Sequence, residues 1–242
     1  MNEIDAQGLH YRLLNKKLRG LIRGGERRIL IKNVCGQRFI GDGIGEEADI
    51  TVDGIPGNDL ACFMDGPRII VRGNAQDGVG NTMNKGEVIV HGDAGDIVGY
   101  SMRGGRIFIR GNVGYRVGIH MKAYKEYVPV VIVGGGARDF LGEYMAGGLL
   151  VILGLNGEEV AGDFIGTGMH GGTIFLRGEV EPARLGKEVK TGEVTDGDMS
   201  LLRRHMADFC ACFGLDVEEI LQKPFSKVYP YSHRPYGTVY AY

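Results

Sequence analysis

The sequence predicts an all-β solenoid, a single-stranded right-handed parallel β-helix of about seven or eight coils. Two observations carry this prediction. Short apolar strands that end in glycine recur at spacings close to 19 residues, and a second motif between them keeps the same period. The 42 glycines of the 242-residue chain are spread through these repeats and are not gathered in a linker. Glycine supplies the positive φ that the corners of such a coil require.

The strand motif is clearest at residues 69–73, 88–92 and 107–111, whose final glycines are 19 residues apart. The remaining copies are residues 50–54, 130–134, 150–154 and 174–178. The residues four and two positions before each glycine are all apolar. In the copy at residues 130–134 they are Val130 and Ile132. Because alternate residues of a strand face opposite sides, we expect these positions to point into the core.

Methionine recurs in the second motif, three residues after the residue at a predicted corner, which is glycine in every copy except the first, where it is Ala61. The methionines are Met64, Met83, Met102, Met121, Met145 and Met169. A column of thioethers has two interpretations, a site for a soft metal ion and a flexible column that fills gaps in the core. The core column is the favoured interpretation, because methionine packs readily into irregular apolar space.

The opposite face of the strands carries a second apolar column. Its members are Thr51, Ile70, Ile89, Phe108, Val131, Val151 and Phe175. A stacked stripe of this size is too large to remain in water on a monomer, so either the C-terminal segment of the chain or another subunit is expected to cover it. The candidate partner-docking residues are therefore Ile70, Ile89, Phe108, Val131, Val151 and Phe175.

The ends of the chain differ from the repeats and define three segments. These are an N-terminal capping segment (1–28), the glycine-repeat β-helix (29–180), and a C-terminal loop with two short helices and an aromatic tail (181–242). Apolar residues at helical spacing over 9–22 predict a helix that caps the first coil. The two C-terminal helices are expected over 198–212 and from Asp216, where Glu219 completes a capping box, to Pro224. The tail from residue 225 is too aromatic to lie free, so we expect it along the solenoid or across a partner.

No residue pattern predicts a catalytic, cofactor-binding or metal site in this chain. Ser101 misses the nucleophile pattern G-x-S-x-G by one residue, and the equivalent repeat positions hold Thr82 and His120. Cys210 and Cys212 are separated by one residue, which is unlike zinc or iron–sulfur spacing. These residues are therefore expected to be structural.

Composition excludes several classes of protein. A net charge of -2 gives no electrostatic basis for binding nucleic acid or an anionic membrane. No run of about 18 apolar residues is present, so no transmembrane helix is expected. The four cysteines form no disulfide-scaffold pattern and the acidic start is unlike a secretory signal, so a cytoplasmic location is expected.

Four stretches of the repeats resemble a known domain. These are residues 57–59 (GND), 78–84 (GVGNTMN), 99–105 (GYSMRGG) and 142–148 (GEYMAGG). They resemble the C-terminal β-helix domain of the glutamate synthase large subunit, and the chain looks like a stand-alone version of that domain. The resemblance covers roughly residues 5–180.

The resemblance implies a non-catalytic structural and docking subunit of a glutamate-synthase-type complex. Its partners would be a flavin-binding synthase subunit and a glutamine amidotransferase subunit, and these would hold the FMN and the iron–sulfur cluster. Two alternatives remain open. One is the glycine-repeat subunit of formylmethanofuran dehydrogenase or N-methylglutamate synthase, and the other is an independent ester hydrolase. Whether the isolated chain forms a homo-oligomer is also open.

Overall fold

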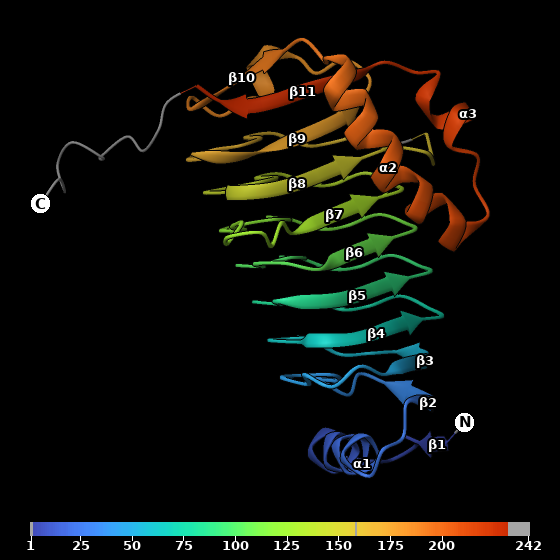
Figure 1. The fold of residues 1–242 in the computed structure, drawn as a ribbon. Coiled ribbons are helices and arrows are strands. Elements are labelled where there is room, and N and C mark those ends of the chain that lie inside the picture. The colour runs from blue at the N-terminus through green and yellow to red at the C-terminus, as the bar shows by residue number, and fades with distance from the viewer. Residues whose placement is uncertain (1, 158, 232–242) are drawn as a thin grey trace, which may run out of the picture.

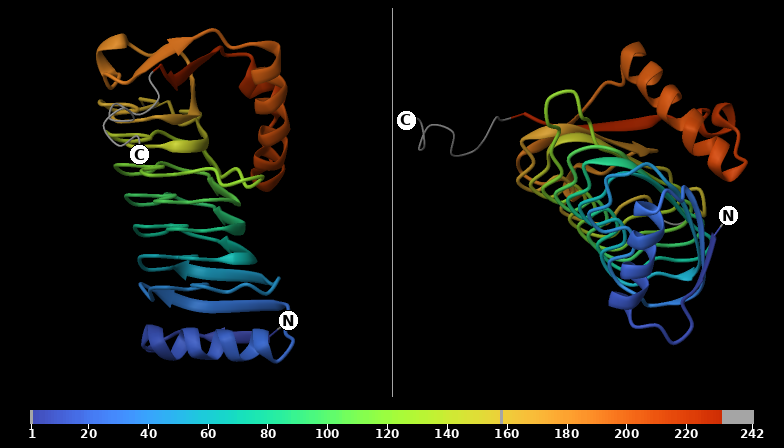
Figure 2. Two further views of the ribbon diagram at one scale, coloured as in Figure 1. Left: turned by 60° about the vertical axis from the view of Figure 1, so that its left-hand side comes forward. Right: turned by 60° about the horizontal axis from the view of Figure 1, so that its bottom comes forward.

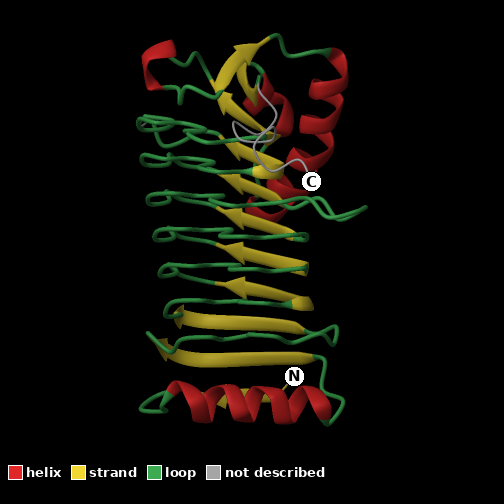
Figure 3. Ribbon diagram, turned by 90° about the vertical axis from the view of Figure 1, so that its left-hand side faces the viewer, coloured by secondary structure: helices red, strands yellow, loops and turns green. Residues whose placement is uncertain are grey.

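The chain winds into a solenoid of about seven turns, seen here in a computed structural model that describes residues 2–157 and 159–231 (Figure 1). One sheet runs the length of the column, with its strands stacked one turn apart (Figure 3). Its first nine strands, in chain order, are β1 (Asn2–Asp5), β2 (Arg28–Cys35), β3 (Asp49–Ile55), β4 (Asp65–Val71), β5 (Lys85–Val90), β6 (Arg106–Ile109), β7 (Val130–Val133), β8 (Ala146–Ile152) and β9 (Gly171–Arg177).

All neighbouring strands from β1 to β9 pair in parallel, and the repeated residues stack on one another. Ile50 pairs with Ile69, which in turn pairs with Val88. Because each strand receives hydrogen bonds from the coil before and the coil after, the backbone is satisfied along the column. The predicted solenoid is thus confirmed.

The interior of the coils is filled by the inward strand residues and by the methionine column. All six methionines are fully buried in this core. Glycines at the start of the strands make room for them: a Cβ on Gly105 would lie 2.5 Å from the Met83 methyl carbon, and one on Gly172 would lie 2.5 Å from that of Met145. The methionines therefore form a core column, as the favoured interpretation predicted.

The register of β7 differs from the prediction. Val131 pairs with the inward Ile107, so Val131 lies in the core, while Val130 and Ile132 face outward. The cause lies in the three consecutive glycines, because Gly135 and not Gly134 stacks on Gly111, with a hydrogen bond of 2.9 Å from the Gly135 N–H to the Gly111 carbonyl. A shift of one residue exchanges the two faces of a strand.

Ladders of Asn and Asp side chains follow the strands and explain many glycines that have ordinary φ values. The Asp93 N–H donates to Asn74 Oδ1 (3.0 Å), and the Asn112 N–H donates to Asp93 Oδ1 (2.7 Å). A Cβ on Gly92 would lie 2.0 Å from the same Asn74 oxygen. These glycines are thus required because the side chain of the previous coil occupies the space that a Cβ would need.

Helix α1 (Tyr11–Arg23) closes the N-terminal end of the column and lies across the first coil (Figure 2). Its residues Leu14, Leu18 and Ile22 are buried in the same core as the coils. The helix confirms the predicted cap, although it begins two residues later and ends one residue later than the predicted range. Strand β1, which pairs with β2, was not anticipated from the sequence.

The C-terminal segment closes the other end and then returns along the sheet. It contains the short 3-10 helix η1 (Pro182–Arg184), β10 (Val189–Gly192), α2 (Asp196–Phe213), α3 (Val217–Leu221) and β11 (Phe225–Pro230). Strand β11 pairs antiparallel with β9, and β10 pairs antiparallel with β11. These two strands continue the sheet beyond β9, and the start of the tail lies along the solenoid as predicted. The loop predicted for 181–197 is corrected by β10, and tail residues 232–242 lie outside the described residues.

The capping box was assigned to the wrong helix. It lies at the start of α2, where Thr195 and Asp198 bond each other's backbone N–H. At α3, Asp216 is the N-cap residue, and its side chain accepts from the Glu218 N–H at 2.8 Å. Lys227 of β11 also reaches Asp198, with Nζ 2.8 Å from Oδ2, and so attaches the start of α2 to the end strand.

Candidate interaction surfaces

The C-terminal segment covers most of the outer apolar stripe. Helix α2 stands alongside the sheet over its C-terminal half (Figure 2), and Leu202, Met206 and Phe209 pack against the outward residues of the strands. The rings of Phe108 and Phe209 meet edge to face, with centroids 5.8 Å apart. Of the two coverings considered from the sequence, the structure therefore shows the chain's own segment.

The six candidate docking residues fall into three groups. Ile89, Phe108, Val151 and Phe175 lie buried beneath the C-terminal segment. Ile70 is half-buried at the margin of the same cluster. Val131 points into the solenoid core, and its expected place in the stripe is taken by Ile132. The part of the stripe that remains partly open is therefore at β3 and β4, where Thr51 and Ile70 lie.

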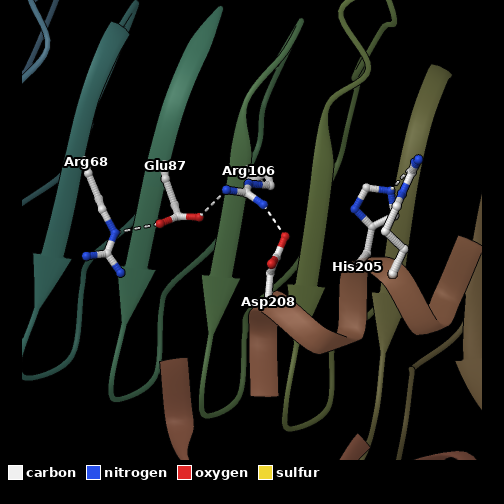
Figure 4. A network of polar contacts seen from close by, with 6 residues as sticks. Arg68, Glu87, Arg106, His205 and Asp208 are labelled. Carbon is white, nitrogen blue, oxygen red and sulfur yellow. Dashed lines mark hydrogen bonds and ion pairs between the residues drawn. The ribbon is translucent and has the colours of Figure 1, made fainter. Parts of the chain in front are cut away.

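A row of alternating charges joins α2 to the sheet (Figure 4). Arg68 Nε lies 2.7 Å from Glu87 Oε2, and Arg106 Nη2 lies 2.9 Å from Glu87 Oε1. Arg106 also forms an ion pair with Asp208 of α2. The Glu87 side chain is only 13% exposed, whereas both arginine side chains are 40% or more exposed. Because exposed ion pairs contribute about 0–1 kcal/mol each, this row orients α2 more than it stabilises the fold.

Burial favours the neutral forms of three titratable groups, His205 and Cys210 of α2 and Cys62 of the coils. Burial lowers the pKa of His205 below its ordinary value of 6.5, and the positive charges of Arg204 and Arg106 add to this effect. Burial, with the nearby carboxylate of Asp216, raises the pKa of the Cys210 thiol to about 11. Burial also raises the pKa of Cys62 to about 12. Since the thiolate is the reactive form of cysteine, Cys62 and Cys210 are poor nucleophiles near neutral pH.

Ser101 occupies a corner of the repeat. Its φ is +51°, close to the +52° of Thr82 and the +55° of His120 one coil before and after. The Ser101 N–H donates to the Ile119 carbonyl at 2.9 Å, which is the bond that this corner makes from coil to coil. Within residues 2–157 and 159–231, no histidine or carboxylate bonds the Ser101 hydroxyl, and no three His, Cys, Asp or Glu side chains are grouped to hold a metal ion.

Exposed aromatic residues on several corners were not anticipated from the sequence. Phe63, Tyr144 and Phe164 each have positive φ and are about half exposed. Phe140 and Phe164 stack with centroids 4.9 Å apart, and the guanidinium of Arg116 lies 4.5 Å from the Phe140 ring centroid. The left-handed conformation is costly for such residues. The signal in the sequence was an aromatic residue directly before the methionine, at Phe63 and Tyr144, or two positions before the corner glycine, at Phe140 and Phe164.

The described helices include none with the length and apolar character needed to cross a bilayer. The model of the family described as "GXGXG motif" matches residues 25–231, which is most of the chain. A relative in Methanocaldococcus jannaschii, uncharacterized protein MJ1350, is 49% identical over 249 aligned residues, covering 98% of this chain and 95% of that protein. With its coil of stacked glycine corners, the chain belongs to the GXGXG-motif family, of the glutamate synthase C-terminal domain type.

Proposed function

We propose that this chain is a non-catalytic structural and docking subunit of a glutamate-synthase-type oxidoreductase complex, acting in glutamate biosynthesis. The observation that carries the proposal is the family match across residues 25–231, which spans the whole solenoid and its C-terminal segment. In this proposal the partners are a flavin-binding synthase subunit and a glutamine amidotransferase subunit. Those partners hold the FMN and the iron–sulfur cluster, and they meet this chain in the cytoplasm.

The shape of the chain supports such a role. About seven turns at roughly 4.8 Å per turn give a column on the order of 35 Å long. Hydrogen bonds between the coils and the ladders of Asn and Asp side chains support a rigid column. Helix α1 closes one end of the column, and β10 and β11 close the other. A rigid column with closed ends can hold two partner subunits at a fixed separation.

The side chains also support a role without chemistry of its own. The thiols of Cys62 and Cys210 are held protonated, and Ser101 serves as a repeat corner. Glu87, the most buried member of the charge row, has both of its oxygens bonded to arginines. Each of these groups has a structural partner or a structural reason for its place.

The test is isolation of the chain from its source cells. With a tag at the native locus, we expect the chain to co-purify in a whole-number ratio with a flavin-binding protein and an amidotransferase, as measured by native mass spectrometry. Recovery of the chain alone, or with the subunits of a different oxidoreductase, would contradict the proposal. Ester hydrolysis by the pure chain that is lost in a Ser101→Ala variant would instead establish the hydrolase alternative.

A further inference from the structure

A cavity lies at the N-terminal end of the column, between α1 and the first coil. Its volume is about 500 Å³, and it is open to solvent on one side. The residues lining it are Tyr11, Arg12, Asn15, Lys16, Arg19, Gly20, Arg23, Phe39 and Asp42. Four of these nine carry a positive charge, and the one acid, Asp42, is already paired with Arg19 at 3.2 Å.

The positive charge extends over the whole exposed face of α1. From Tyr11 to Arg28 the sequence contains one acid, Glu26, and these cations: Arg12, Lys16, Lys17, Arg19, Arg23, Arg27 and Arg28. The chain as a whole has a net charge of -2, so its charge is strongly uneven. Within the described residues, Lys16, Lys17 and Arg23 form no ion pair, and all three are exposed. Unpaired like charges on one face attract an anionic partner.

A buried amide in the cavity wall lacks one of its partners. Asn15 is only 9% exposed, and its Nδ2 donates to the Arg38 carbonyl at 2.9 Å. This bond fixes the orientation of the amide, which leaves Oδ1 without a donor among the described residues. A buried acceptor without a donor costs free energy.

The remaining features of the surface favour a protein over other anions. Leu13 is 54% exposed in the middle of the cationic face, as an apolar anchor within a charged rim would be. A 13-residue helix is about 20 Å long, which is short for a nucleic-acid duplex. The neighbouring coil carries the acids Glu46, Glu47 and Asp49, all exposed, so the positive patch ends at the helix. A short acidic segment fits within this patch, whereas an extended polyphosphate or an anionic membrane would also meet these acids.

We propose that the exposed face of α1 and the adjacent cavity bind an acidic segment of a partner subunit. Its carboxylates pair with Lys16, Lys17 and Arg23, and an apolar side chain packs on Leu13. The inference rests on the proposed function, since it assigns the end of the column that a subunit of the complex contacts.

The first experiment reverses the charge of the face in the full chain. The variant Lys16→Glu/Lys17→Glu/Arg23→Glu is expressed with a tag in the source cells, and the partners retained are quantified. The control is Lys85→Glu/Arg103→Glu/Lys122→Glu, which changes three equally exposed cations on the wall of the solenoid. We expect at least about a tenfold loss of one subunit from the α1 variant and none from the control. Equal melting temperatures would show that both variants are folded.

The second experiment identifies the occupant. A carbodiimide joins amines directly to carboxylates, so treatment of the native complex should link Lys16 or Lys17 to Asp or Glu residues of one partner peptide, as located by mass spectrometry. Links only within this chain, or co-elution of nucleic acid that nuclease removes, would overturn the inference. Equal partner retention by wild type and both variants would also overturn it while leaving the proposed function intact. Absence of partners from the wild-type preparation would count against the proposed function itself.

Discussion

Replacing Gly86 with alanine is expected to lower the free energy of unfolding by about 3–5 kcal/mol. Gly86 lies in β5 with φ near +99°, a conformation that strains any residue with a Cβ. The new Cβ would lie 2.3 Å from the carbonyl oxygen of Pro67 and 3.0 Å from the Met64 methyl carbon. The first is backbone of the paired strand and the second is part of the closed core, so neither atom can move without shifting a neighbouring coil.

The matched control is Gly20→Ala in α1. That glycine is in a helix and an added Cβ would have no neighbour within 4 Å, so the substitution should stabilise the chain by about 0.5–1 kcal/mol. Urea unfolding followed by circular dichroism measures both variants. A loss below about 1 kcal/mol for Gly86→Ala would show that the coils are not packed as closely as the structure has them.

The second large effect is expected at Phe209 of α2. This side chain is fully buried, and its ring contacts Phe108 and Phe213. Phe209→Ala should weaken the attachment of α2 to the sheet by about 3 kcal/mol, because the substitution leaves a cavity in the outer cluster. Hydrogen exchange of the α2 amides should accelerate by about a hundredfold, as measured by mass spectrometry.

The detached helix would also uncover the apolar stripe of β5 to β9. Phe209→Ala is therefore expected to self-associate as its concentration rises, which size-exclusion chromatography with light scattering would detect. Phe63→Ala serves as the control, since that side chain is 53% exposed and its loss should change stability by less than about 0.5 kcal/mol. Unchanged α2 exchange in Phe209→Ala would mean that the outer cluster does not hold the helix in place.

The repeat was predictable because each coil must satisfy the same packing rules as its neighbours. Apolar residues two positions apart specify the inner face of each strand. The methionine that stands three residues after each corner residue marks the corner that follows the strand. The exception is β7. At Gly134–Gly136 any of three glycines could close the strand, and choosing Gly134 reversed the faces of β7. Choosing Gly135 restores a 19-residue step to Gly154.

Contacts between distant segments were less predictable. The apolar stripe predicted that a protein segment must cover Phe108 and Phe175. The repeat pattern could not predict whether that segment is Phe209 of the same chain or part of another subunit. The same holds for the cavity at α1. Its lining combines a helix with Phe39 and Asp42 of the first coil, and the missing donor of Asn15 emerges only when the Arg38 carbonyl is placed beside it.

The stacking of successive repeats as coils in register is tested most directly by distances along one outward column. Register partners link Arg28, through Arg68, to Thr173, with seven strand steps from Arg28 and five from Arg68. Spin labels at these positions, in a chain whose four native cysteines are replaced by alanine, report the separation by pulsed electron paramagnetic resonance. Stacked coils predict about 34 Å for Arg28 to Thr173 and about 24 Å for Arg68 to Thr173. The solenoid would be contradicted if the Arg68–Thr173 distance were not about two strand spacings shorter than the Arg28–Thr173 distance.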